Sequence, residues 1–180
     1  MSPPAEEPRA GRVLISEGQL RRRVAELGQR IGQDYAGQNP VVVGVLQGAF
    51  VFMADLIRAM PIELTTEFIG LSSYGAGTTS SGQVRLVADL SISIEARPVL
   101  IVEDIVDTGL TLAYLKRNLE ARHPRSVRAC ALADKAGRRV VPVEVDYVGF
   151  TVPDVYVVGY GFDRGGVFRN LPYVAVLEGE

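Results

Sequence analysis

Uninterrupted apolar runs alternate along the chain with segments of helical periodicity. Residues 41–46 and 99–102 are the two clearest runs, and each predicts a β-strand that is buried on both faces. After each run comes a turn, and then apolar residues recur every three or four positions, as on one face of a helix. This repeated order of strand, turn and helix is typical of an α/β domain with a mainly parallel sheet flanked by helices.

The same patterns place the other elements. Ser16 and Gln19 have the spacing of a capping box and predict the start of a first helix, which ends at residues 38–40. A second helix follows the strand at 41–46 and stops at Pro61. Further strands are expected at residues 62–69, 84–90, 127–133, 146–150 and 155–160.

The first twelve residues are rich in proline, glutamate and alanine and predict a flexible tail, which leaves residues 13–180 as a single domain. The tail lacks the apolar core of a secretory signal. No apolar run approaches the roughly 20 residues that a membrane-spanning helix needs. The single cysteine, Cys130, excludes an internal disulfide. Together these features predict a cytoplasmic protein with no membrane partner.

The charge balance narrows the choice of partners. Charged residues make up 22% of the 180 residues, and the net charge is −2 at pH 7. Without a strongly basic composition, the sequence gives no support for nucleic-acid binding. An anionic substrate must therefore be held by a few local groups.

The apolar run at residues 99–102 leads into the stretch with the clearest chemical meaning. Glu103 and Asp104 follow it as a pair of carboxylates, which suit sugar hydroxyls or a magnesium ion. A turn and the start of a helix come next, where backbone amides and hydroxyls can bind a phosphate. A ribose 5-phosphate satisfies both demands. The residues expected to hold the phosphate are Asp107, Thr108, Gly109, Leu110 and Thr111.

This stretch resembles the phosphoribosyl-diphosphate signature of type I phosphoribosyltransferases. Three more segments resemble the hypoxanthine-guanine members of that family, in the family's order: residues 46–48 its diphosphate loop, Ser73 and Tyr74 its flexible lid, and residues 148–174 its carboxyl-terminal region. The glycine- and serine-rich composition of residues 71–82 also suits a lid. The resemblance implies the type I phosphoribosyltransferase fold, with a small hood beside the sheet. It also implies transfer of the 5-phosphoribosyl group from 5-phosphoribosyl 1-diphosphate (PRPP) to N9 of hypoxanthine or guanine.

The resemblance further implies roles for single residues. Glu103 and Asp104 would hold the ribose hydroxyls, directly or through magnesium, and Asp163 would be a second magnesium ligand beside the purine. Asp107 would accept a proton from the purine as well as bind the 5-phosphate. Lys135 would donate to the 6-oxo group of the purine. The remaining implied roles are diphosphate binding by Leu46, Gln47, Gly48 and Arg169, stacking on the purine by Tyr156, and backbone contact with the purine edge by Val157.

Three of these roles also follow from side-chain chemistry. Lysine has donors and no acceptor, so Lys135 favours an oxo group, and therefore hypoxanthine or guanine over adenine. The flat ring of Tyr156 supplies stacking area at a low entropic cost. The planar guanidinium of Arg169 suits a diphosphate.

Two positions depart from the family pattern. Relatives usually carry lysine where this chain has Gln47, and some carry lysine where it has Leu110. Both departures bear on the affinity for PRPP more than on the reaction. The resemblance also implies a cis peptide bond in the diphosphate loop and a homodimer or homotetramer. Two alternatives stay open: a phosphoribosyltransferase that prefers xanthine, and a nucleotide-sensing regulatory protein on the same fold.

Overall fold

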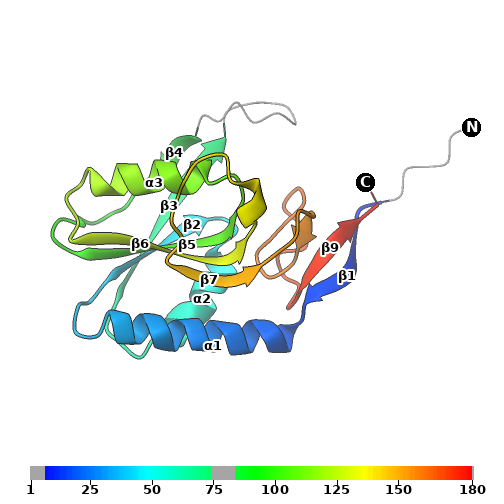
Figure 1. Ribbon diagram of the computed structural model, residues 1–180, viewed down its shortest axis with the longest axis horizontal. Helices are drawn as coiled ribbons and strands as arrows, with labels where there is room; N and C mark the ends of the chain where they lie inside the picture. Colours follow the sequence, from blue (N-terminus) through cyan, green and yellow to red (C-terminus); the bar gives the residue numbers. More distant parts are fainter. Residues whose placement is uncertain (1–6, 74–83, 180) are drawn as a thin grey trace, which may run out of the picture.

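The computed structural model of the protein describes residues 7–73 and 84–179. In this part of the chain, helices lie on both faces of a six-stranded sheet, and a small three-stranded sheet lies beside it (Figure 1). The predicted α/β architecture is confirmed. Tyr74 of the predicted lid lies outside the described residues, and the segment predicted as a lid is described only as far as Ser73.

The main sheet consists of β2 (Val41–Leu46), β3 (Thr65–Ser73), β4 (Val84–Ala88), β5 (Pro98–Val106), β6 (Ser126–Asp134) and β7 (Tyr147–Thr151). Its strand order is β4-β3-β2-β5-β6-β7. All neighbours are parallel except β4, which runs antiparallel to β3 at one edge. The apolar runs of β2 and β5 lie in the middle of the sheet and are buried, as the sequence predicts.

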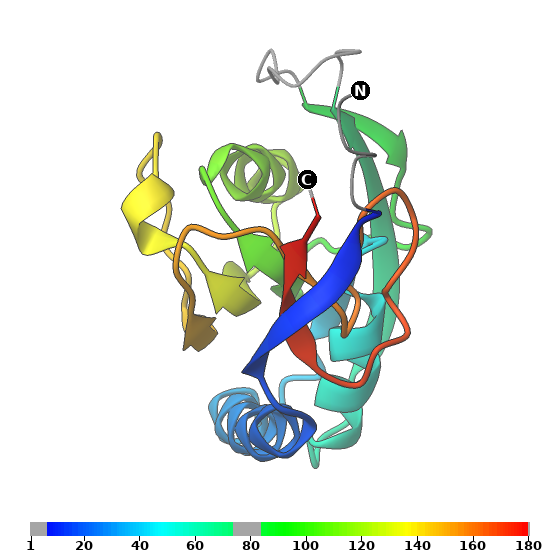
Figure 2. The same ribbon diagram turned by 90° about the vertical axis from the view of Figure 1, so that its right-hand side faces the viewer.

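The helices are α1 (Glu17–Asp34), α2 (Phe50–Arg58), α3 (Leu110–Glu120) and the short 3-10 helix η1 (Ala136–Arg138). Successive side chains of a strand point to opposite faces of the sheet. Val42 and Leu100 therefore pack with residues of α1 and α2, whereas Val43 and Ile101 pack with residues of α3. Figure 2 shows α1 and α3 on opposite sides of the molecule. The core thus has two halves, one on each face of the sheet.

The first helix begins as predicted. The Ser16 hydroxyl accepts a hydrogen bond from the Gln19 amide at 3.4 Å, and the Gln19 side chain accepts one from the Ser16 amide at 2.9 Å. This capping box satisfies amides that would otherwise lack partners at the start of α1. The helix ends at Asp34, a few residues before the predicted end at 38–40.

The small sheet has the order β1-β9-β8, with β1 at Arg9–Ile15, β9 at Val174–Glu178 and β8 at Val157–Val158, all antiparallel. The boundary predicted for the tail is wrong, since residues 9–12 form part of β1. Their composition does not reveal a pairing with β9 at the other end of the chain. The strand predicted at 155–160 is also wrong in extent, because φ turns positive at Gly159, Tyr160 and Gly161 and ends the extended backbone.

Other boundaries also differ from the prediction, and two of them bear on the site or the sheet. β5 continues beyond the predicted run because its last residues pair with the end of β6. Glu103 and Asp104 therefore lie within the strand, not after it. β3 covers residues 65–73 rather than 62–69, since its pairing with β2 begins at Thr65. Among the described residues, no helix is long and apolar enough to cross a membrane.

Four buried side chains resist deprotonation in the folded state. Burial raises the pKa of Tyr147 to about 12, and it also raises the pKa of Tyr35, Tyr160 and Cys130. Such groups lose their protons first in the unfolded chain, so deprotonation favours unfolding. We therefore expect the temperature at the midpoint of thermal unfolding to decrease as the pH is raised from about 8 to about 11. Circular dichroism measures this temperature. A constant midpoint across this range would contradict the expectation.

Candidate active site

The predicted site residues gather where the parallel strands end. The strands β2, β5 and β6 run toward the small sheet (Figure 1), and the loops after them meet there. This edge of a parallel sheet is the usual place for a binding site. It holds two cavities, of about 220 and 270 Å³, and Asp107 lines both of them.

The smaller cavity is formed by the turn that joins β5 to α3. It is lined by Asp107, Thr108, Gly109 and Thr111, which the sequence predicts as phosphate-binding residues. Leu110, the fifth residue of that set, is the first residue of α3. The cavity therefore lies at the amino end of a helix, where unpaired amides and the helix dipole favour an anion.

The turn requires glycine at position 109. Gly109 has a φ of +86°, and a Cβ atom there would lie 2.9 Å from Cγ1 of Val143. We therefore expect Gly109→Ala to lower the free energy of unfolding by about 1–3 kcal/mol in urea denaturation. Gly137→Ala is the matched control, because a Cβ atom on Gly137 would meet nothing within 4 Å. Equal stability of the two variants would contradict the requirement for glycine at position 109.

The larger cavity lies between the ends of β5 and β6 and the segment around β8. The structure thus brings together predicted residues from separate parts of the sequence. The Tyr156 ring is 45% exposed, and its hydroxyl donates to the carbonyl oxygen of Asp163 at 3.0 Å. The Lys135 amide donates to the carbonyl oxygen of Val106 at 3.0 Å. The cavity is lined by Asp104, Ile105, Asp107, Lys135, Tyr156, Val157, Phe162 and Asp163.

The loop after β2 passes close to Asp104. A Cβ atom on Gly48 would lie 1.7 Å from Oδ2 of Asp104, so any side chain there would displace the carboxylate. A Cβ atom on Gly161 would lie 2.2 Å from the carbonyl oxygen of Gly48. The Leu46–Gln47 peptide bond is cis, as the resemblance implies. This predicted diphosphate loop therefore lies against both the acidic pair and the carboxyl-terminal segment.

The acidic pair lies in a poorly hydrated place. Glu103 is only 6% exposed, and burial, followed by the charge of Asp104, raises its pKa well above the ordinary value. Burial also raises the pKa of Asp104 to about 6, although the Ile105 amide donates to its carboxylate at 2.7 Å and Arg169 opposes the shift. Carboxylates in such a place are stabilised by a cation or by hydroxyl donors.

Asp163 and Arg169 form an ion pair beside the larger cavity. Nη2 of Arg169 lies 2.7 Å from Oδ1 of Asp163, and Nη1 donates to the carbonyl oxygen of Gly161 at 2.5 Å. Oδ2 of Asp163 accepts a hydrogen bond from the Gly166 amide at 2.6 Å. These contacts hold the loop after β8 in shape and keep Arg169 near the acidic residues.

The structure adds three charged residues to those that the sequence predicts. Arg138 pairs with Asp107 and with Asp154, and its hydrogen bond to Asp154 lowers the pKa of that carboxyl. Arg139 donates to two carbonyl oxygens at the end of β5 and pairs with Asp134. In the sequence, Arg138 and Arg139 are simply two arginines that follow Lys135, and Asp154 is an aspartate that follows a proline. Their spacing does not indicate which groups they face.

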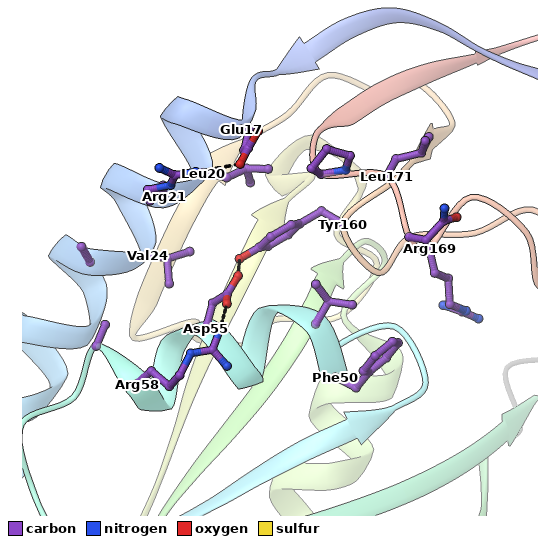
Figure 3. A pocket seen from close by; sticks show the side chains of 15 residues that line it. Glu17, Leu20, Arg21, Val24, Phe50, Asp55, Arg58, Tyr160, Arg169 and Leu171 are labelled. Atoms are coloured by element: carbon purple, nitrogen blue, oxygen red, sulfur yellow. Dashed lines mark hydrogen bonds and ion pairs between the residues drawn. The ribbon is translucent and has the colours of Figure 1, made fainter.

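A third cavity, of about 790 Å³, lies between α1, α2 and residues 169–172 (Figure 3). The Tyr160 hydroxyl donates to Oδ2 of Asp55 at 2.5 Å there, and Asp55 also pairs with Arg58. Of the predicted site residues that the structure describes, Arg169 alone lines this cavity. The Tyr160–Asp55 contact ties the carboxyl-terminal segment to α2, which follows the diphosphate loop.

Comparisons with known proteins agree with this arrangement. Residues 16–164 match a family model described as the phosphoribosyl transferase domain. The chain is 46% identical over 167 residues to the hypoxanthine-guanine phosphoribosyltransferase of Bacillus subtilis, covering 93% of both chains. The solved structure of a hypoxanthine phosphoribosyltransferase from Staphylococcus aureus is similar with a TM-score of 0.90 and 41% identity, covering 94% of this chain and 92% of that one.

A longer relative contains the same region. The chain is 48% identical over 169 residues to the bifunctional protein TilS/HprT of Listeria innocua, covering 94% of this chain. It spans only 26% of that relative's length. The resemblance recognised in the sequence is confirmed by the family model and by relatives matched over nearly their whole length. The chain belongs to the hypoxanthine-guanine phosphoribosyltransferase family.

Proposed function

We propose that this protein transfers the 5-phosphoribosyl group of PRPP to N9 of hypoxanthine or guanine, giving IMP or GMP and diphosphate. This pentosyl transfer is a purine-salvage reaction. The observation that carries the proposal is the position of Asp107, which lines both the cavity at the amino end of α3 and the cavity of Lys135 and Tyr156. A nucleotide with its phosphate in one cavity and its base in the other would place its ribose beside Asp107.

The donor is held mainly by the ends of β2 and β5. We assign the 5-phosphate to the turn at residues 107–111 and the ribose hydroxyls to Glu103 and Asp104. The diphosphate would lie against residues 46–48 and Arg169, whose planar guanidinium can donate to two oxygens. Because Gln47 carries no charge, the backbone amides of this loop and Arg169 would supply the positive contacts.

The purine lies on the other side of Asp107. Lys135 would donate to the 6-oxo group, and Tyr156 would stack on the ring. The backbone of Val157 would meet the edge of the base, beside Asp163. An amino group in place of the oxo group would face the Lys135 ammonium as donor against donor, so adenine would bind poorly.

Magnesium fits the acidic residues of the site. Among the described residues, no three acidic, histidine or cysteine side chains lie close enough to hold a metal ion by themselves. Mg²⁺ usually takes one or two carboxylates and fills its shell with water and substrate oxygens. Glu103 and Asp104 on one side and Asp163 on the other would therefore hold an ion together with the donor. When bound, the ion neutralises charge that develops on the diphosphate.

The reaction is a displacement at the anomeric carbon. The bond from N9 forms while the bond to the diphosphate oxygen breaks, and the ribose takes on oxocarbenium character. Asp107 would accept the purine proton, or hold it at N7, as N9 attacks. Lys135 and Tyr156 orient the base, which reduces the entropic part of the barrier.

We propose that the chain from β1 onward acts as a single phosphoribosyltransferase domain and that it assembles into a homodimer or homotetramer. A cytoplasmic location fits the single buried thiol, Cys130, and the use of a phosphorylated donor.

The function is tested with purified protein, PRPP and Mg²⁺, offering hypoxanthine, guanine, xanthine and adenine in turn. We expect turnover of the first two bases and little of adenine in a spectrophotometric assay. Turnover of xanthine alone would keep the mechanism but contradict the assigned acceptor. No turnover of any base, together with retention of RNA on filters, would contradict the proposal and favour a regulatory protein.

A further inference from the structure

The guanidinium of Arg138 lies between two carboxylates, one of which lines the larger cavity, called here the purine cavity. Its Nε donates to Oδ1 of Asp107 at 2.7 Å, and its Nη1 donates to Oδ2 of Asp154 at 2.8 Å. The other oxygen of Asp154, Oδ1, lies 3.5 Å from Nζ of Lys135. Asp107, Arg138, Asp154 and Lys135 therefore form a row of alternating charges, which we call the charged row.

The charged row joins three segments of the chain. Asp107 follows β5, Lys135 precedes η1, Arg138 is the last residue of η1, and Asp154 follows β7. Backbone hydrogen bonds already align these segments: the Lys135 amide donates to the carbonyl oxygen of Val106 at 3.0 Å, and the Val152 amide donates to the carbonyl oxygen of Asp134 at 3.0 Å. The side chains of the row add contacts between groups whose backbones are already in place.

Stability does not explain the row. The side chains of Arg138 and Asp154 are 46% and 58% exposed, and ion pairs this exposed contribute little to folding. The ends of the row differ from its middle, because Asp107 and Lys135 line the purine cavity while Arg138 and Asp154 are not among its lining residues. Arg138 thus contacts a group that faces the substrate without itself lining that cavity.

We propose that Arg138 is a positioning residue for the purine, an inference that rests on the proposed function. It holds Oδ1 of Asp107 and leaves Oδ2 for the purine proton; among the described residues no hydrogen bond to that oxygen is found. Through Asp154 it also restrains Lys135, so the proton acceptor and the 6-oxo donor keep a fixed separation. A planar guanidinium can bridge two carboxylates in this way, whereas an ammonium is a point charge.

Steady-state kinetics of Arg138→Ala and Arg138→Lys test the proposal. We expect Arg138→Ala to lower kcat/KM for hypoxanthine by about 10-fold or more, because small displacements of reacting groups are costly. The KM for PRPP should stay within about twofold of the wild-type value, since Arg138 itself does not line the phosphate cavity. Arg138→Lys should recover at most part of the loss. Arg125→Ala, at an exposed arginine before β6 at the opposite edge of the sheet, is the matched control and should behave as the wild type.

The second readout is coupling along the charged row. Asp154→Asn should also lower kcat/KM for hypoxanthine, and the double variant with Arg138→Ala should lose less than the product of the two single losses, because both act through one network. Multiplicative losses would overturn the idea of a row.

Three further results would overturn the role of Arg138. The first is a normal kcat/KM for hypoxanthine in Arg138→Ala, and the second is full activity in Arg138→Lys. The third is an Arg138→Ala variant whose kinetic parameters for PRPP and for hypoxanthine worsen equally and whose unfolding temperature is lower. If the wild-type protein turns over no purine, the proposed function fails and this inference fails with it. Normal wild-type turnover with normal Arg138→Ala contradicts the positioning role alone.

Discussion

Replacing Asp107 with asparagine is expected to lower kcat for hypoxanthine by about 10² to 10⁴, the usual range of general acid–base catalysis. Asparagine keeps the shape of the side chain and one acceptor oxygen, so the turn before α3 should keep its form. It cannot accept the purine proton, and it loses the charge that pairs with Arg138 at 2.7 Å. The measurement is the initial rate at saturating PRPP and hypoxanthine.

The control for this variant is Asp89→Asn. Asp89 also pairs with an arginine, Arg122, at 2.8 Å, but it lies after β4 and away from the cavities lined by Asp107. Its loss should leave kcat unchanged. If Asp107→Asn keeps kcat within about threefold of the wild-type value, Asp107 does not take the purine proton.

Replacing Lys135 with alanine is expected to lower kcat/KM for hypoxanthine and guanine by about 30- to 150-fold, or about 2–3 kcal/mol. The 6-oxo group would lose a charge-assisted hydrogen bond from a side chain that is only 11% exposed. The KM for PRPP should change little, because Lys135 lines the purine cavity and not the phosphate cavity. Initial rates with each substrate varied in turn separate the two effects.

Lys116→Ala is a matched control for this change. The side chains of Lys116 and Lys135 are similarly buried, 16% and 11% exposed, and each lies 3.5 Å from an aspartate oxygen. Lys116 belongs to α3 and pairs with Asp146, outside the larger cavity. An equal loss of purine and donor affinity in Lys135→Ala would move Lys135 out of the purine site.

Local patterns predicted most of the main sheet. The apolar runs at 41–46 and 99–102 lie in its two central strands, and the capping box at Ser16 starts the first helix. These signals depend on residues that are neighbours in the sequence. Among the strands, local patterns missed β1 and β9, because these two segments from opposite ends of the chain become strands by pairing with each other.

The same distinction applies to the site. Residues 103–111 could be recognised together because the strand, the carboxylates and the phosphate turn are contiguous. Lys135, Tyr156 and Asp163 could be assigned only through the resemblance, since the cavity that unites them forms after folding. Arg138 carries no local signal for its role, and its partners Asp107 and Asp154 lie 31 and 16 positions away in the chain.

We propose that the phosphate cavity, at residues 107–111, and the purine cavity, at Lys135 and Tyr156, form one active site. The products of the wild-type reaction test this most directly. The protein is incubated with PRPP, Mg²⁺ and hypoxanthine, and the nucleotide, diphosphate and sugar phosphate are separated by chromatography. We predict that IMP and diphosphate form in equal amounts as hypoxanthine is consumed. Release of diphosphate with free ribose 5-phosphate and no IMP would contradict transfer at a shared site.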